Sequence, residues 1–358
     1  MKILALNSSA RVGRDSKTQI MLDALVEGMK DAGADVEVVN LKDKKIKVCA
    51  GCFACWSKTP GKCIQKDDMS AELFDKWIAA DLCVYATPLF HHTVNATMKA
   101  FIERTLPAIK PYLIKESDRW SHPMRYDNYP GAVILSVCGF PEVSAFDALK
   151  HYAKYLFWDE HGGLWGEIYR AGAETLPLSS VKDEILAATR KAGKELVENK
   201  KISPETQAKI EQPIVSSMED YACTANMFWD TCIDEGVSPR EFDKKGLRPR
   251  PKDIKGFLLL MGMGFNPVKA GDTNAVMQFD FSGQVNAKCH LAIKEGKITC
   301  TEGAADAPDL TVITPFDIWM DIMTGKADGG ESFMAQKYTA EGNMDLLLKM
   351  DSFFGPDE

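Results

Sequence analysis

The chain has 358 residues, of which 45% are hydrophobic and 26% charged, and its formal net charge is −8. This length exceeds the roughly 250–300 residues that one hydrophobic core serves, so we expect two domains. The composition is ordinary for a soluble globular protein, and an acidic chain with no basic stripe is not expected to bind nucleic acid.

The amino-terminal end predicts a cytoplasmic protein. Residues 1–7 are too short and too quickly polar for a signal peptide. The longest apolar run, 257–265, is shorter than the about 20 residues that a membrane helix needs. Ten cysteines in such a chain do not favour a disulfide framework. Six of them are scattered and are expected to be small buried hydrophobic residues: Cys83, Cys138, Cys223, Cys232, Cys289 and Cys300.

The first elements in the chain are a strand at residues 2–6, a polar loop at 8–18 and an amphipathic helix that Gly33 closes. Small hydroxylated residues before a helix offer backbone N–H groups and a positive dipole end to a phosphate. The loop lacks the glycines of the P-loop and of the dinucleotide-binding motif. The alternative is that its serines and threonines simply cap the helix.

Four cysteines follow the second strand, at 35–40, within a short loop: Cys49, Cys52, Cys55 and Cys63. Thiolates gathered in this way bind a soft metal or an iron–sulfur cluster, which is the interpretation that we favour. A structural zinc site, a local disulfide and unliganded thiols are the alternatives.

Strands and helices then alternate. We predict helices at 68–80, 94–105, 144–157 and 181–198, and strands at 82–87, 132–137 and 167–170. This alternation indicates a doubly wound α/β domain, whose ligands bind beyond the carboxyl ends of the strands.

Three unusual loops lie at that edge, at 8–18, 88–93 and 138–141. A phosphate-binding end and two loops with aromatic and small residues suit a flat phosphorylated ring such as flavin mononucleotide (FMN). His91 and His92 lie beside the expected ring, where a surface or packing role is favoured over holding flavin charge or donating a proton. Because the flavin performs the hard chemistry, we expect no catalytic acid or base.

These segments resemble the NADPH-dependent FMN reductase and iron–sulfur flavoprotein family. The likeness rests on Asn7-Ser8-Ser9-Ala10-Arg11 with Ser16-Lys17-Thr18, on Thr87-Pro88-Leu89-Phe90 with Val94-Asn95-Ala96-Thr97-Met98-Lys99-Ala100-Phe101-Ile102-Glu103-Arg104, and on the cysteine run. It spans residues 1 to about 200 and implies a flavodoxin-like fold, FMN, a homodimer or homotetramer, and NAD(P)H or ferredoxin as donor. The implied FMN-binding residues are Ser9, Arg11, Ser16, Lys17, Thr18, Pro88, Leu89, Phe90, His91, Cys138, Gly139 and Phe140. The implied [4Fe–4S] ligands are Cys49, Cys52, Cys55 and Cys63.

The residue pattern changes in the middle of the chain. Ser203 and Pro204 predict the start of a short helix, and residues 218–235 read as another helix. A Pro-rich charged spacer at 248–253 follows, which we interpret as a solvated linker. The predicted division is therefore a domain at 1–202, a helical extension and linker at 203–255, and a domain at 256–358.

The last hundred residues predict a smaller α+β domain. A helix at 257–265 precedes alternating strands at 276–281, 287–294, 298–300 and 310–314, then helices from Pro315 to Gly325 and at 344–354. This part resembles the sterol carrier protein 2 (SCP2) type of lipid-binding domain, through Phe281-Ser282-Gly283, Ala307-Pro308-Asp309-Leu310-Thr311-Val312, Phe316 with Gly325-Lys326, and Tyr338-Thr339-Ala340-Glu341-Gly342-Asn343-Met344. The likeness implies an apolar tunnel, for which we expect as lining Met261, Met263, Trp319, Met320, Met323, Met334, Leu347 and Met350. An ordinary filled core, or a domain that serves only oligomer contacts, is the alternative.

The leading hypothesis is a flavin-dependent oxidoreductase that passes electrons between a reduced donor and an acceptor, with a cluster beside the flavin and an apolar-ligand or assembly domain. Two alternatives stay open. One is a non-catalytic lipid or sterol carrier whose first half senses redox state. The other is a cluster-free NAD(P)H:quinone reductase.

Overall fold

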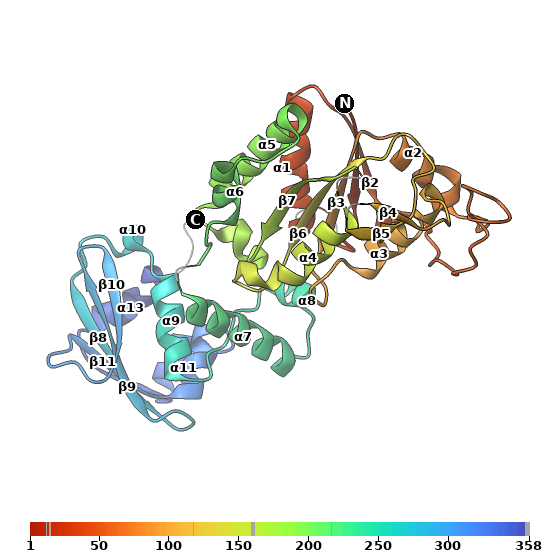
Figure 1. Ribbon diagram of the computed structural model, residues 1–358. Helices are drawn as coiled ribbons and strands as arrows, with labels where there is room; N and C mark the ends of the chain where they lie inside the picture. Colours follow the sequence, from red (N-terminus) through yellow and green to blue (C-terminus); the bar gives the residue numbers. More distant parts are fainter. Residues whose placement is uncertain (12, 14–15, 117, 159–161, 216, 355–358) are drawn as a thin grey trace. The chain divides into compact units, whose positions relative to one another are not determined.

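The computed structural model describes residues 1–11, 13, 16–116, 118–158, 162–215 and 217–354. The chain forms two compact units, Met1–Ser216 and Ser217–Glu358 (Figure 1). Val12, Arg14 and Asp15 of the predicted phosphate loop lie outside the described residues. The three-part division at residues 202 and 255 stays a prediction.

The first unit is built on a five-stranded sheet in the order β2-β1-β3-β6-β7, with every neighbouring pair parallel. The strands are β1 Lys2–Asn7, β2 Asp35–Asn40, β3 Leu82–Pro88, β6 Gly131–Val137 and β7 Leu164–Arg170. This order is that of the flavodoxin-like fold, so the expected fold class is confirmed. The fifth strand begins three residues earlier than predicted. Its first residues lie at the sheet edge and are partly exposed, so they do not form the continuous apolar run that marks a buried strand.

Helices cover both faces of this sheet (Figure 1). Helices α1 Lys17–Asp31 and α5 Lys182–Asn199 pack on one face with α6 Pro204–Glu211 beside them. On the other face lie α2 Phe74–Ile78, α3 Ala96–Glu103 and α4 Asp147–Leu156. Helices α1 and α5 meet closely, since a Cβ built on Gly28 would lie 1.8 Å from the backbone oxygen of Arg190. Only glycine, which has no Cβ, allows the two helix backbones to come this close.

Short elements complete the first unit. The predicted helix at 68–80 is a π-helical turn, η3 Met69–Leu73, that continues into α2. A hairpin of β4 Ile114–Glu116 and β5 Arg119–Ser121 was not predicted, because each strand has only three half-exposed residues.

The second unit contains a mixed sheet in the order β10-β9-β8-β11-β12. Its strands are β8 Ala275–Ser282, β9 Ala287–Lys294, β10 Lys297–Glu302, β11 Leu310–Pro315 and β12 Thr339–Gly342. The first three strands are antiparallel, whereas β11 pairs with β8 in parallel. The helices are α7 Met218–Asp234, α8 Pro239–Lys244, α9 Ile254–Gly264, α10 Pro267–Ala270, α11 Phe316–Met323, α12 Gly329–Met334 and α13 Met344–Phe353.

Aromatic rings fill the core of this unit, with Phe257, Phe279 and Trp319 in contact. Of the expected tunnel residues, Met261, Trp319, Met320 and Met350 are at most 6% exposed and belong to this core; Met323 and Leu347 pack against it. Met263 and Met334 are 63% and 77% exposed. The tunnel stays a prediction.

The basic segment before α9 is held in place rather than free in solvent. The guanidinium of Arg250 donates to Asp321 Oδ1 at 2.6 Å, and its backbone N–H donates to Thr231 Oγ1 at 2.8 Å. In the part of the chain that is described, no helix has the length and apolar character needed to cross a membrane.

Candidate functional site

The loops that follow the strands of the first sheet meet at its carboxyl edge. Asn95 Nδ2 donates to the Ser8 carbonyl at 2.7 Å, which joins the loop after β1 to the start of α3. The Leu89 N–H donates to the Val137 carbonyl at 2.9 Å, so the loops after β3 and β6 are also joined. Because α1 and α3 cover opposite faces, the strands β1 and β3 flank the topological switch point, where such folds bind ligands. The structure therefore brings the three predicted loops together.

The first part of the site is the amino-terminal end of α1. Ser16 caps the helix by accepting from the Gln19 N–H at 3.1 Å, and its hydroxyl donates to Ser9 Oγ at 2.9 Å. Ser9, Ser16 and Thr18 are all at least 95% buried. The first N–H groups of a helix have no partner within it, and the dipole makes this end positive. Buried hydroxyls and free N–H groups at one point form an anion-binding cradle.

Two positively charged side chains beside this cradle pair with the same carboxylate. Arg11 Nη1 lies 3.0 Å from Glu174 Oε1, and Lys17 Nζ lies 3.7 Å from Glu174 Oε2. The Arg11 and Glu174 side chains are more than half exposed, so this pair contributes at most about 1 kcal/mol and is easily exchanged for another anion. Glu174 was not predicted, because it follows β7 and no local pattern marks it.

The second part of the site is aromatic. Phe90 and Phe140 are 57% and 54% exposed, and they come from the loops after β3 and β6. His91 and His92 both have left-handed backbones, with φ of 47° and 63°. The His92 ring stacks on Phe140 with centroids 6.0 Å apart, and its Nδ1 lies 3.1 Å from the Ala145 carbonyl. Two adjacent loops thus present flat apolar side chains, and His92 packs against one of them.

The loop of Cys138, Gly139 and Phe140 is fixed by its backbone. Cys138 N–H donates to the Arg170 carbonyl at 3.1 Å, and the Cys138 carbonyl accepts from Ala173 N–H at 2.8 Å. Burial raises the pKa of the Cys138 thiol to about 11. This thiol is therefore protonated at neutral pH and is not a nucleophile.

The four clustered cysteines lie together in a loop on the first unit. All four are free; Cys52 is exposed, Cys55 buried, and Cys49 and Cys63 are partly exposed. Burial, and then the neighbouring thiols of Cys63, Cys49 and Cys52, raise the pKa of Cys55. The four sulfur atoms therefore share one neighbourhood. Across the described ranges, no three His, Cys, Asp or Glu side chains are arranged to hold a metal ion.

A buried ion pair closes the base of this cysteine loop. Arg104 Nη1 and Nη2 donate to the two carboxylate oxygens of Asp67 at 2.6 and 2.9 Å, and both side chains are 1% exposed. Asp67 also accepts from the Lys47 N–H at 2.9 Å, and Arg104 donates to the Lys47 carbonyl at 2.8 Å. Lys47 and Asp67 stand at the two ends of the cysteine loop. Arg104 Nε is buried, and no described residue accepts a hydrogen bond from it.

Comparisons with known proteins agree with this architecture. Residues 1–139 match the NADPH-dependent FMN reductase family, and residues 268–355 match the SCP-2 sterol transfer family. The first unit is thus a flavodoxin-like domain. The two family matches fall in the two parts of the chain for which the sequence resemblances predicted them.

Several archaeal proteins named iron–sulfur flavoprotein are similar to part of the chain. One from Archaeoglobus fulgidus is 40% identical over 102 residues, which is 28% of this chain and 44% of that protein. One from Methanocaldococcus jannaschii is 31% identical over 104 residues, 29% of this chain and 50% of that protein. The chain spans about half the length of the curated relatives that it matches. Among solved structures, an NAD(P)H:quinone oxidoreductase from Methanothermobacter marburgensis is 20% identical with a TM-score of 0.42, over 55% of this chain and 96% of that one.

Proposed function

We propose that this chain is an FMN-dependent oxidoreductase that passes electrons between a reduced donor, NAD(P)H or ferredoxin, and an acceptor. One observation carries the proposal: the buried hydroxyls of Ser9 and Ser16 meet the amino terminus of α1 at the switch point. These residues lie in the segment that matches the NADPH-dependent FMN reductase family. An anion cradle flanked by exposed aromatic loops fits a phosphorylated ring.

The chain's own residues bind and orient the cofactor in this proposal. The phosphate is held by Ser9, Ser16, Thr18 and the first N–H groups of α1. Its charge is neutralised by Arg11 and Lys17, which give up their ion pairs with Glu174. The ring rests against residues 88–91 and 138–140. When bound, FMN supplies the hydride and electron chemistry. No side chain has to accept a proton, and the Cys138 thiol stays neutral beside the ring.

We further propose that Cys49, Cys52, Cys55 and Cys63 hold a [4Fe–4S] cluster. Cluster ligands bind different iron atoms, so they stand farther apart than the ligands of one metal ion. The shared neighbourhood of the four thiols supports this, as does Arg104, whose buried Nε–H has no acceptor among the described residues. Burial lowers the pKa of Arg104, but Asp67 and then the Cys63 thiol raise it. A cluster sulfur ligand at Cys63 would accept from that N–H.

The second unit binds an apolar ligand or assists assembly in this proposal, and its match to the SCP-2 family supports the first role. We place the protein in the cytoplasm as a homodimer or homotetramer. The division into residues 1–202, 203–255 and 256–358 belongs to the same proposal.

A visible absorption spectrum of anaerobically purified protein tests both cofactors at once. Flavin bands with a broad brown shoulder, iron and acid-labile sulfide, and turnover of NAD(P)H or reduced ferredoxin with an acceptor are the expected results. Flavin bands and turnover without iron would favour the cluster-free quinone reductase. Binding of a fluorescent fatty acid by protein that stays colourless after addition of FMN would favour the lipid carrier and contradict the proposal.

A further inference from the structure

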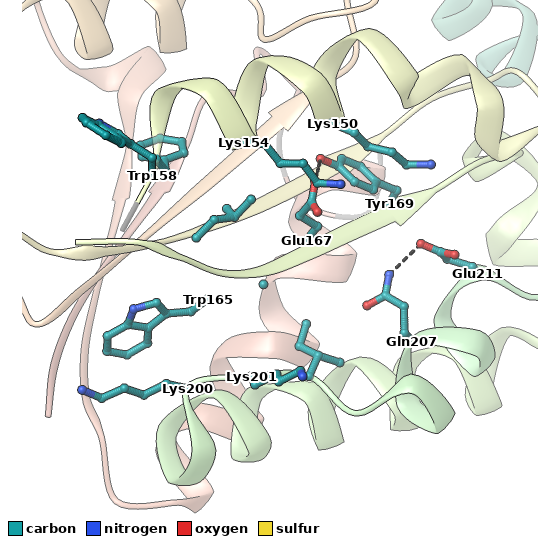
Figure 2. A pocket seen from close by; sticks show the side chains of 14 residues that line it. Lys150, Lys154, Trp158, Trp165, Glu167, Tyr169, Lys200, Lys201, Gln207 and Glu211 are labelled. Carbon is teal, nitrogen blue, oxygen red and sulfur yellow. Dashed lines mark hydrogen bonds between the residues drawn. The ribbon is translucent and has the colours of Figure 1, made fainter. Parts of the chain in front are cut away.

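A groove of about 780 Å³ runs along the outer edge of β7 in the first unit (Figure 2). Strand β7 pairs with β6 on one side, and no described strand pairs with its other side. Helix α4 forms one wall of the groove, and residues 200–211 form the other. None of the proposed FMN-binding residues lines it.

The floor of the groove is a strand edge with backbone groups facing outward. The Arg170 carbonyl accepts from Cys138 N–H at 3.1 Å, so Arg170 faces the sheet interior. Backbone groups alternate in direction along a strand, so those of Tyr169 and Glu167 point away from β6. Tyr169 is only 1% exposed, so of these two it is Glu167 whose backbone reaches the groove. Such groups form a template for an added strand. The partly exposed residues 164–167 of β7 extend for about 13 Å, at about 3.3 Å per residue, which suits an extended segment of about four residues.

The walls carry more positive than negative charge, in a chain whose formal net charge is −8. Lys150 and Lys154 come from α4, and Lys200 and Lys201 from the end of α5 (Figure 2). Of these four, Lys150 alone has an ion pair with a described residue, Asp147, at 3.2 Å.

The two carboxylates of the groove face neutral donors. Glu167 accepts from the Tyr169 hydroxyl at 2.8 Å, and Glu211 accepts from Gln207 Nε2 at 2.6 Å. Carboxylates satisfied in this way leave the lysines available to an acidic ligand. The indole of Trp165 stands at one end of the groove, 4.8 Å from Lys200 Nζ, and adds an apolar contact.

Charge also decides which occupant fits. A second copy of this chain, paired edge to edge, would bring its own four lysines against these, and like charges across an interface are costly. Lysines also protect free edges from pairing, but they do so on the edge strand itself. Strand β7 carries no lysine, and the lysines stand on the walls, on either side of its partly exposed residues 164–167.

We propose that the β7 edge binds an acidic extended segment of a partner protein, which adds to the sheet as a sixth strand. Its side chains alternate between the wall of Lys150 and Lys154 and the wall of Lys200 and Lys201, and one apolar side chain meets Trp165. This interaction surface is independent of the proposed redox function.

The test uses the full-length protein and a fluorescein-labelled eight-residue peptide that alternates glutamate and valine, followed by fluorescence anisotropy. The peptide binds, and the double variant Lys154→Glu/Lys201→Glu weakens binding roughly tenfold or more. The matched control Lys30→Glu/Lys115→Glu reverses two exposed lysines elsewhere in the first unit and leaves the affinity unchanged. No binding, or equal losses in both double variants, overturns the proposal.

A second peptide separates strand addition from simple ion pairing. N-methylation of alternate peptide nitrogens keeps the charges and removes the hydrogen-bond donors, so it abolishes binding if the peptide joins the sheet. Hydrogen exchange at Glu167 slows only with the unmethylated peptide. Equal binding of the two peptides, or displacement by inorganic polyphosphate with no change in hydrogen exchange, shows a general anion site and overturns strand addition.

Discussion

Replacement of Asp67 by asparagine removes the carboxylate from the buried pair that closes the cysteine loop. Asp67 accepts from two guanidinium nitrogens of Arg104 and from the backbone N–H groups of Lys47 and Ser70. Both side chains of the pair are 1% exposed, so the variant leaves a buried guanidinium without its counter-charge. Breaking such a pair on one side costs about 3–5 kcal/mol of unfolding free energy. We expect a loss in this range for Asp67→Asn.

Urea unfolding followed by circular dichroism measures this loss. The double variant Asp67→Leu/Arg104→Met removes both charges and recovers much of the stability, because no buried ion is left unpaired. Asp75→Asn, on the exposed side of α2, is the matched control and changes the unfolding free energy by less than about 0.5 kcal/mol. A loss below about 1 kcal/mol in Asp67→Asn would refute the reasoning.

The same pair predicts a dependence of stability on pH. Burial alone would raise the pKa of Asp67, but the hydrogen bonds from Arg104, Lys47 and Ser70 outweigh it and hold the pKa below its ordinary value of 3.8. A lowered carboxyl pKa stabilises the fold above the unfolded pKa, and this stability is lost as pH falls through the folded pKa. The wild type therefore loses stability below about pH 4, and Asp67→Asn lacks this part of the loss. Identical acid profiles would contradict the assignment.

Three further changes have defined outcomes. Ser16→Ala removes the cap of α1, which is worth about 1 kcal/mol of stability, and weakens FMN binding in a flavin fluorescence titration. The control Ser217→Ala removes the equivalent cap of α7 and leaves FMN binding unchanged. In protein freed of iron by a chelator, iodoacetamide at pH 8 labels the exposed Cys52 faster than Cys138, whose pKa burial raises to about 11; equal labelling by mass spectrometry would contradict this. Gly28→Ala places a methyl group against the backbone of α5 and costs more than about 2 kcal/mol in thermal or urea unfolding.

Much of the first unit follows from local pattern. The strands at 82–87 and 132–137 are continuous apolar runs, and such runs indicate parallel strands that helices cover on both faces. The helix at 218–235 and the cap at Ser203 were predicted within a residue or two, because cap chemistry and periodicity reside in neighbouring residues. The three loops of the candidate site were also predicted, since the order of strands and helices places the loops after successive strands at one edge.

The amino-acid sequence by itself determined the strand–helix alternation, the hydroxyl-rich loop and the four-cysteine run, since each depends on spacing within about twenty residues. Tertiary structure alone decided the contact of Arg11 with Glu174, 163 positions away, and the pair of Arg104 with Asp67, 37 positions away. It also decided the parallel pairing of β11 with β8 and the position of the partly exposed start of β7 between lysine-bearing walls. Periodicity reports which face of an element is buried, but it carries no information on which distant residue completes a charge or a hydrogen bond.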